Sequence, residues 1–406
     1  MLLVTGFARA EGKVYIDVTS PDFRKLPVAI QSFTGGKEIS DTIKDDLDFT
    51  GFFSCIDDAA QIERPDQAFS PANWTGLGVE FVVKGRATQT ANGLDLVISA
   101  YDVSAGKETL RKAYTATPGL QRQLAHTVAN DIYSLLTGQQ GIFRTQIAFV
   151  GEKAGKSEIY LMDWDGHNIQ GLGVTGSILL APHWASDKSH LLYSAERFRQ
   201  WGLYLLDTRA RKERLIVMLR GLNIAGNFLP GNKEFIFTSS KDGNPDIYIA
   251  NIKTIMGRKI ISTPWIDVSP SVSPDGSSIV FVSNRSGTPQ IYISDMDGSG
   301  VRRITFQGSY NTAPSWSPRA DRIVFTSMIG GKNQICLIKL DGSEFTQLTD
   351  RGNNEDPSFS PDGRYIVFTS NMDGKKGLYI MRSNGEGARR ITPKGLIANK
   401  AGWSPL

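Results

Sequence analysis

Few residues of the kinds that build metal sites, disulfides or catalytic centres occur in this sequence. Its 406 residues include two cysteines, Cys55 and Cys336, and four histidines. The cysteines lie far apart and no Cys-x-x-Cys motif occurs, so we expect neither zinc nor a disulfide framework. No Gly-x-Ser-x-Gly nucleophile motif occurs either. We therefore expect no catalytic residues, no metal site and no cofactor.

The chain also lacks a strong net charge and a long apolar run. Its formal net charge is +4, which is too small to predict binding to nucleic acid or to a membrane surface. No apolar run approaches the roughly 18 residues that span a bilayer, so direct membrane insertion is not expected. A nucleic-acid-binding protein is an alternative that the pI of about 8.8 permits only weakly.

The first ten residues, MLLVTGFARA, resemble the end of a secretory signal. An apolar stretch precedes Ala8-Arg9-Ala10, and these residues before Glu11 fit the small-residue cleavage rule. We predict that residues 1–10 are a residual signal peptide and that the mature chain acts outside the cytoplasm. Because the basic region of a signal is missing, an ordinary N-terminus is the alternative.

A repeat of 43–44 residues occupies the rest of the chain from about residue 139. Short apolar runs such as IVFTS recur, each with a central aromatic residue: Phe149, Tyr193, Phe237, Phe281, Phe325 and Phe368. A second set keeps step with the first: Tyr160, Tyr204, Tyr248, Tyr292, Cys336 and Tyr379. Each unit has four short strand patterns with Asp-Gly or Asn-Gly turns, which is typical of a β-propeller blade.

Six copies predict a mainly β protein with a six-bladed propeller at 139–406. The closing sequence AGWSPL repeats the first strand of a blade, but no second strand follows it. The first blade lacks such a strand. We therefore expect the C-terminal strand to complete the first blade and close the ring, which removes exposed sheet edges.

Residues 11–138 lack the repeat and predict a small α/β (α+β) domain. Strand patterns occur at 26–33, 79–88, 94–103 and 108–116. Helices are predicted at 37–51 and from Thr117, as N-cap, to Gly138. His126 on the second helix has no local partner for catalysis, so we interpret it as a structural histidine.

Over essentially its whole length the chain resembles the TolB family, periplasmic propeller proteins of the Tol–Pal system. The junction sequence AHTVANDIYSLLTGQQGIFRTQIAFV at 125–150, the SPDG…IVFTS…IY repeats and the terminal WSP carry the resemblance. It implies a non-enzymatic, monomeric periplasmic hub that supports outer-membrane integrity and cell division. It further implies binding of the lipoprotein Pal at one mouth of the propeller, binding of TolA through the N-terminal segment, and other envelope proteins as further candidate partners.

The loops at one end of the blades are polar and asparagine-rich, as a recognition surface on a rigid scaffold can be. We predict that Pal is bound at this mouth by Asn223, Asp267, Tyr310, Asn311, Asn354, Glu355, Asp356, Asn399 and Lys400. Tyr310 is the preferred anchor because aromatic residues dominate interface hot spots. The alternative is that these loops are polar only because they face water.

The segment predicted to contact TolA is an alternating pattern that could add a strand to a sheet edge. It comprises Val14, Tyr15, Ile16, Asp17 and Val18. The alternative is that this segment is only the first structural strand of the N-terminal domain. For the protein as a whole, the competing function is a propeller hydrolase or a peptidase-accessory domain.

Overall fold

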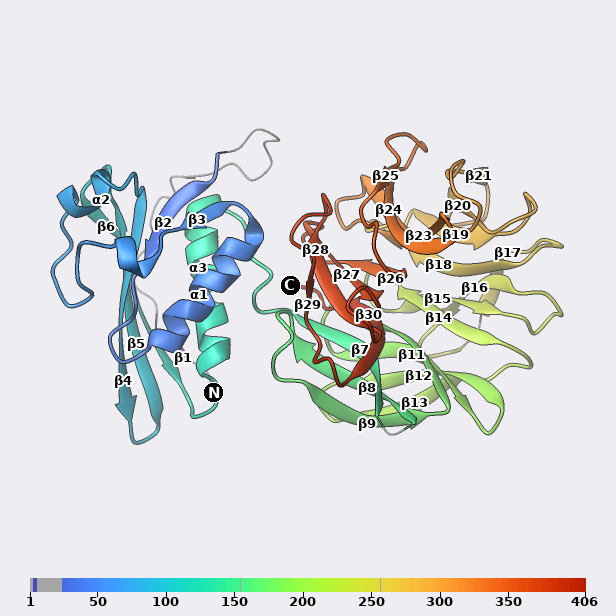
Figure 1. Ribbon diagram of the computed structural model, residues 1–406. Coiled ribbons are helices and arrows are strands. Elements are labelled where there is room, and N and C mark those ends of the chain that lie inside the picture. The colour runs from blue at the N-terminus through green and yellow to red at the C-terminus, as the bar shows by residue number, and fades with distance from the viewer. Residues whose placement is uncertain (1–2, 6–23, 154, 256) are drawn as a thin grey trace. The chain divides into compact units, whose positions relative to one another are not determined.

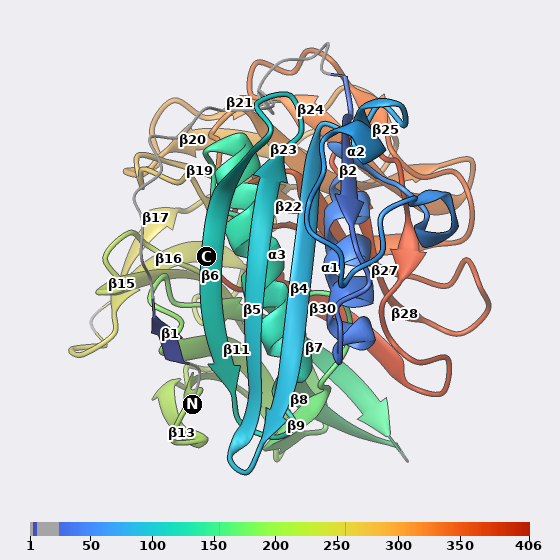
Figure 2. The same ribbon diagram turned by 90° about the vertical axis from the view of Figure 1, so that its left-hand side faces the viewer.

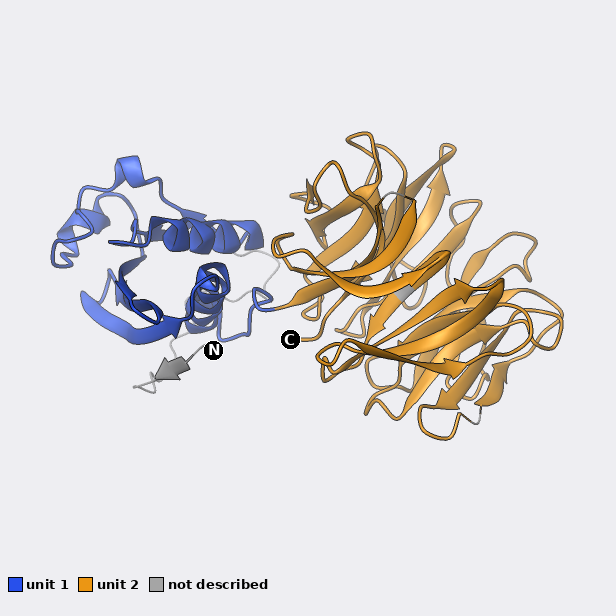
Figure 3. Ribbon diagram, turned by 90° about the horizontal axis from the view of Figure 1, so that it is seen from below, with its two compact units in different colours: residues 1–144 blue, residues 145–406 orange. Residues whose placement is uncertain are grey.

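The computed structural model describes residues 3–5, 24–153, 155–255 and 257–406 (Figure 1). The predicted segment Val14–Val18 and most of the predicted signal peptide lie outside these residues. The chain divides into two compact units, residues 1–144 and 145–406 (Figure 3).

The N-terminal unit is a six-stranded sheet with two long helices on one of its faces (Figure 2). The strand order is β1-β6-β5-β4-β2-β3, with β2 parallel to both β3 and β4 and the other pairs antiparallel. The strands are β1 (Leu3–Thr5), β2 (Leu26–Ile30), β3 (Phe53–Cys55), β4 (Phe81–Thr90), β5 (Gly93–Asp102) and β6 (Lys107–Ala116). The helices are α1 (Lys37–Thr50), η1 (Asp58–Ala60), α2 (Ala72–Thr75) and α3 (Gln121–Thr137).

The two long helices pair with each other through their buried faces. Helix α3 begins at Gln121, later than predicted, because Leu120 donates back to Thr117 in a turn before the helix. It ends at Gly138, whose positive φ of 68° fits the predicted glycine cap. His126 is buried and its Nδ1 lies 2.7 Å from Oδ2 of Asp46 on α1, an environment that fits the predicted structural histidine. Among the described residues, no helix is long and apolar enough to cross a bilayer.

A buried ion pair fixes the loop between η1 and α2 to the sheet. The Glu63 carboxylate is fully buried and contacts the Lys84 ammonium on β4. It also accepts hydrogen bonds from the Ser70 backbone N–H at 2.7 Å and from Asn73 Nδ2 at 3.1 Å. A buried carboxylate needs such compensation because its desolvation is costly.

Residues 145–406 form six four-stranded antiparallel sheets, which confirms the predicted six-bladed propeller. The strands of each blade are named A to D in their order within the sheet. Blade one contains β30 (Ile397–Trp403), β7 (Gln146–Lys153), β8 (Lys156–Asp163) and β9 (Gln170–Gly176). Blade two contains β10 (Ile178–Trp184), β11 (His190–Arg197), β12 (Gln200–Asp207) and β13 (Lys212–Val217). Blade three contains β14 (Asn223–Phe228), β15 (Glu234–Ser239), β16 (Asp246–Asn251) and β17 (Gly257–Ile261).

The last three blades have very short outer strands. Blade four contains β18 (Asp267–Val272), β19 (Ser278–Ser283), β20 (Gln290–Asp295) and β21 (Arg302–Arg303). Blade five contains β22 (Asn311–Trp316), β23 (Arg322–Ile329), β24 (Lys332–Lys339) and β25 (Thr346–Gln347). Blade six contains β26 (Asn354–Phe359), β27 (Tyr365–Ser370), β28 (Gly377–Arg382) and β29 (Arg389–Arg390).

Strand β30 supplies the inner strand of blade one by pairing with β7. Polar contacts strengthen this closure. The Trp403 indole N–H donates to Thr145 Oγ1 at 2.8 Å in a buried position. The Ser404 backbone N–H donates to the Gln146 carbonyl at 2.8 Å, and the Gln146 N–H donates to Ser404 Oγ at 3.0 Å. The two ends of the propeller are therefore joined by side chains as well as by the strand ladder.

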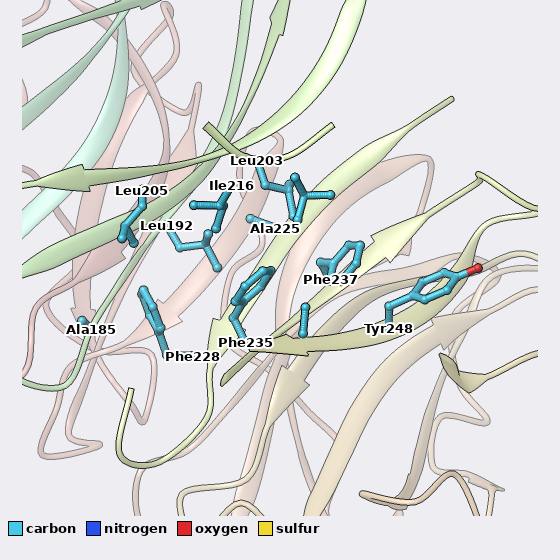
Figure 4. Packing of buried hydrophobic residues seen from close by; sticks show 12 residues of the cluster. Ala185, Leu192, Leu203, Leu205, Ile216, Ala225, Phe228, Phe235, Phe237 and Tyr248 are labelled. Carbon is cyan, nitrogen blue, oxygen red and sulfur yellow. The ribbon is translucent and has the colours of Figure 1, made fainter. Parts of the chain in front are cut away.

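Neighbouring blades pack through apolar faces, because the B strands are apolar on successive residues and are therefore covered on both faces. Figure 4 shows Leu192, Leu203 and Ile216 of blade two against Phe228, Phe235 and Phe237 of blade three. The two aromatic sets of the repeat meet as cross-strand pairs. Stacked rings lie 5.4–6.0 Å apart in the pairs Phe149–Tyr160, Tyr193–Tyr204, Phe237–Tyr248, Phe281–Tyr292 and Phe368–Tyr379. In blade five Phe325 faces Cys336 instead.

Candidate protein-binding face

The antiparallel order of the strands gives the propeller two different faces. The loops from B to C and from D to the next A lie at one end of the strands, and those from A to B and from C to D lie at the other. We call the first end the B–C/D–A face. Its B–C loops include residues 198–199, 240–245, 284–289, 330–331 and 371–376, and its D–A loops include 218–222, 262–266, 304–310, 348–353 and 391–396.

The A strands surround a central channel. A cavity of about 250 Å³ is lined by residues from all six: Leu180, Pro182, His183, Ile224, Ala225, Asn227, Ser269–Ser271, Ala313–Ser315, Asp356–Ser358 and Lys400–Gly402. In four A strands a β-bulge places one residue at a positive φ: Ser269 at 53°, Ala313 at 49°, Asp356 at 53° and Lys400 at 52°. A bulge re-aims a side chain out of the strand pattern. At two of these four positions the residue is charged, so Asp356 places a carboxylate and Lys400 an ammonium group on the channel wall.

Burial sets the ionisation of the titratable groups in the channel. Desolvation raises the pKa of Asp356, while the nearby Lys400 ammonium opposes this rise. Desolvation lowers the pKa of Lys400, and the Asp356 carboxylate opposes that fall. Desolvation also lowers the pKa of His183 to about 4, so the imidazole is neutral at pH 7. Its Nδ1 lies 3.2 Å from Asn227 Nδ2.

Four of the nine predicted partner-binding residues have a structural role instead. Asn223, Asp267, Asn311 and Asn354 each begin an A strand and are fully buried. Asn311 Nδ2 donates to Gln290 Oε1 at 2.7 Å and to the Gln307 carbonyl at 2.8 Å. Such bonds tie each D–A loop to its blade. Because these side chains have no exposed surface, we remove them from the predicted partner contacts.

The equivalent bonds differ in detail between blades. Asn354 repeats the pattern of Asn311, with donation to Gln334 Oε1 at 2.9 Å and to the Arg351 carbonyl at 2.9 Å. Asp267 instead accepts from the Arg285 guanidinium at 2.8 Å. Asn223 donates to the carbonyls of Trp201 and Leu219 and accepts from Ser239. The polar side chain that recurs at this position therefore stabilises its own blade.

The other five predicted residues keep some exposure. Glu355 is half-buried, with Lys376 at 2.8 Å and Asn333 Nδ2 at 2.9 Å, and Asn399 is half-buried in β30. Asp356 and Lys400 line the channel. Tyr310 is 44% exposed in a D–A loop. The structure therefore separates the predicted set into channel groups, a rim ion pair and one exposed aromatic residue.

Sequence reasoning missed the exposed apolar side chains on the same face. Phe198 is 98% exposed in a B–C loop, Phe306 is 70% exposed and Trp265 is 45% exposed in D–A loops. Further exposed side chains in these loops are Met218, Leu219, Ile266 and Tyr310. In the A–B and C–D turns that the structure describes, the exposed large apolar side chains are Ile255 and Val301. The apolar surface is therefore concentrated on one face, which favours protein docking there.

Comparison with known protein families identifies the chain's relatives. Residues 133–406 match the family model described as the TolB beta propeller domain. The chain belongs to the TolB family. Residues 14–109 match the model of the TolB amino-terminal domain, so both units of this family member have counterparts.

Individual relatives agree with this assignment. The chain is 34% identical over 246 residues to the Tol-Pal system protein TolB of Desulfosudis oleivorans, covering 56% of each chain. It is 39% identical over 181 residues to that of Geobacter metallireducens, covering 41% of this chain and 42% of the relative. The chain thus spans about half the length of these curated relatives. The crystal structure of TolB from Acinetobacter baumannii aligns with 97% of this chain and 100% of its own, at a TM-score of 0.83 and 25% identity.

Proposed function

We propose that this TolB-family chain is a non-enzymatic, periplasmic protein-binding hub of a Tol–Pal system. In this proposal the B–C/D–A face binds the lipoprotein Pal, and the N-terminal segment Val14–Val18 contacts TolA. The two contacts support outer-membrane integrity and cell division. The observation that carries the proposal is the concentration of exposed aromatic and aliphatic side chains in the loops of one face of the propeller.

The chemistry of this face suits recognition of a protein. Phe306 and Tyr310 lie in the same D–A loop, and both expose large apolar areas. Aromatic side chains that stand on a rigid scaffold lose little conformational freedom on binding and are enriched in interface hot spots. The channel charges Asp356 and Lys400 are partly desolvated, so a partner segment that enters the mouth can contact them with little further desolvation.

Calorimetric titration of the chain with purified Pal tests the proposal. We expect saturable one-to-one binding, which is weakened by Tyr310→Ala or Phe306→Ala. Val301→Ala is the matched control, because it removes an exposed apolar side chain from the opposite face. The proposal would be contradicted if the titration gave no heat of binding and the chain did not co-migrate with Pal.

The proposed TolA contact needs a separate experiment. A chain that begins at Pro21 lacks the segment Val14–Val18. We expect this shortened chain to lose TolA binding and to keep its propeller fold, as followed by near-ultraviolet circular dichroism. Undiminished TolA binding by the shortened chain would refute the assignment of this segment.

A further inference from the structure

A groove on the B–C/D–A face lies at blade two, away from the channel lining. It has a volume of about 510 Å³. The hairpin between β11 and β12 and the loop between β13 and β14 supply its lining: Arg199, Gln200, Trp201, Met218, Leu219, Arg220 and Gly221. No acidic residue is among these lining residues. We call this hollow the blade-two groove.

The hairpin beside the groove has an unfavourable sequence for its backbone. Arg197 pairs with Gln200, so Phe198 and Arg199 form a two-residue turn, with φ values of 52° and 62°. Positive φ at both turn residues is the geometry that favours glycine and asparagine. Blade five makes the equivalent turn with Gly330 and Gly331, at φ values of 58° and 77°.

Folding of the propeller does not account for the side chains at this turn. Phe198 is 98% exposed, so its ring gains no packing within the chain. Arg199 is exposed as well, and both residues replace the glycines that blade five uses. Backbone strain and an exposed aromatic side chain at the same place point to a contact with another molecule.

The charges around the groove indicate what it binds. Arg197 is already committed, because its guanidinium donates to both Glu213 oxygens at 2.6 and 2.8 Å and stacks 4.3 Å from the centre of the Tyr204 ring. Within the described residues, by contrast, no ion pair involves Arg199 or Arg220. Two exposed guanidinium groups therefore flank an apolar surface.

We propose that the blade-two groove is a second contact for the protein that docks on the B–C/D–A face, and that it binds an acidic segment carrying an apolar side chain. The arginine guanidinium group suits carboxylates because it can donate two parallel hydrogen bonds to one carboxylate group. Phe198, Met218 and Leu219 provide the matching apolar contacts. The inference rests on the proposed function, in which this protein is Pal.

The test compares Pal binding by the wild-type chain and three variants at low and high salt. Phe198→Gly/Arg199→Gly copies the turn of blade five and removes both side chains. Arg220→Gln removes only one charge. Arg209→Gln is the matched control, because Arg209 is an exposed arginine in the C–D turn of the same blade, on the opposite face.

We expect the double glycine variant to weaken Pal binding by about tenfold or more, and Arg220→Gln to weaken it by roughly fivefold. Both should show a smaller loss of affinity with added salt than the wild type, because a steering charge is gone. Arg209→Gln should bind as the wild type does. The melting temperature of the double glycine variant should not fall, because glycine suits this turn, so weaker binding cannot be ascribed to unfolding.

Three results would overturn the inference in distinguishable ways. If the wild type binds Pal and the groove variants bind with unchanged affinity and salt dependence, the groove is not part of the interface while the proposed function stands. An equal loss in Arg209→Gln would likewise exclude a local role for the groove. If the wild type does not bind Pal at all, the proposed function fails and the inference fails with it.

Discussion

Ending the chain at Gly402 removes the contacts that join the two ends of the propeller. The truncation deletes Trp403, which is buried, and the three hydrogen bonds that Trp403 and Ser404 make with Thr145 and Gln146. Loss of a buried tryptophan side chain costs about 3–5 kcal/mol. Each hydrogen bond contributes about 1 kcal/mol, so the expected loss of unfolding free energy is about 6–8 kcal/mol. This is comparable with the whole stability of a typical domain, which is about 5–15 kcal/mol.

An internal tryptophan provides the matched control. Trp316 occupies the equivalent position in blade five and is similarly buried, but it does not join the ends of the ring. Trp316→Ala should lower the free energy of unfolding only by the cost of losing a buried tryptophan side chain, about 3–5 kcal/mol. Thr145→Val should cost about 1 kcal/mol or somewhat more, because it leaves the Trp403 indole N–H without its acceptor.

Urea unfolding followed by near-ultraviolet circular dichroism measures these losses, because the stacked aromatic pairs lie within the propeller. We expect the truncated chain to have lost most of the propeller transition at a urea concentration where Trp316→Ala is still folded. Equal midpoints for the truncated and full-length chains would refute the reasoning. So would a cost for Trp316→Ala as large as that of the truncation.

Three further predictions concern ionisation, partner binding and the N-terminal unit. Burial lowers the pKa of His183 from 6.5 to about 4, so between these pH values the unfolded chain binds more protons than the folded chain. The free energy of unfolding should therefore fall as the pH drops from 6.5 to 4, by at most about 3 kcal/mol. His183→Gln should remove this part of the pH dependence in urea titrations. Tyr310→Ala should weaken Pal binding by about 1–3 kcal/mol in calorimetry, and Val301→Ala should not weaken it. Glu63→Gln should destabilise the N-terminal unit by about 3–5 kcal/mol in thermal unfolding, because it leaves the Lys84 ammonium buried without its counter-charge. An unchanged melting temperature would contradict this account of the ion pair.

The fold was predictable because its determinants recur. Phe149, Tyr193, Phe237 and Phe281 follow one another at the blade period, each with its tyrosine partner, and this regularity alone predicts stacked sheets. Local boundaries were less predictable. The start of α3 was placed too early because Pro118 suits a first helical turn, whereas Gly119 adopts a φ of +84° and a turn precedes the helix.

The candidate site was less predictable, since the polar residues chosen for it belong to the repeat itself. Asn223, Asp267, Asn311 and Asn354 recur at the same spacing as the core aromatics, and burial explains that spacing. Phe198 breaks the repeat, because an aromatic residue stands where a glycine suits the turn. In a chain built from repeats, residues that every blade shares serve packing, and departures from the pattern are better candidates for binding.

The long separation in sequence between β7 and β30 determines when blade one can form. During synthesis β7 appears early, but the strand that covers its inner edge is made only after the other blades. Blades two to six each draw all four strands from a contiguous stretch and can assemble as they emerge. Blade one alone lacks its innermost strand through that interval, so β7 is left unpaired on that side and mispairing with another molecule would begin there.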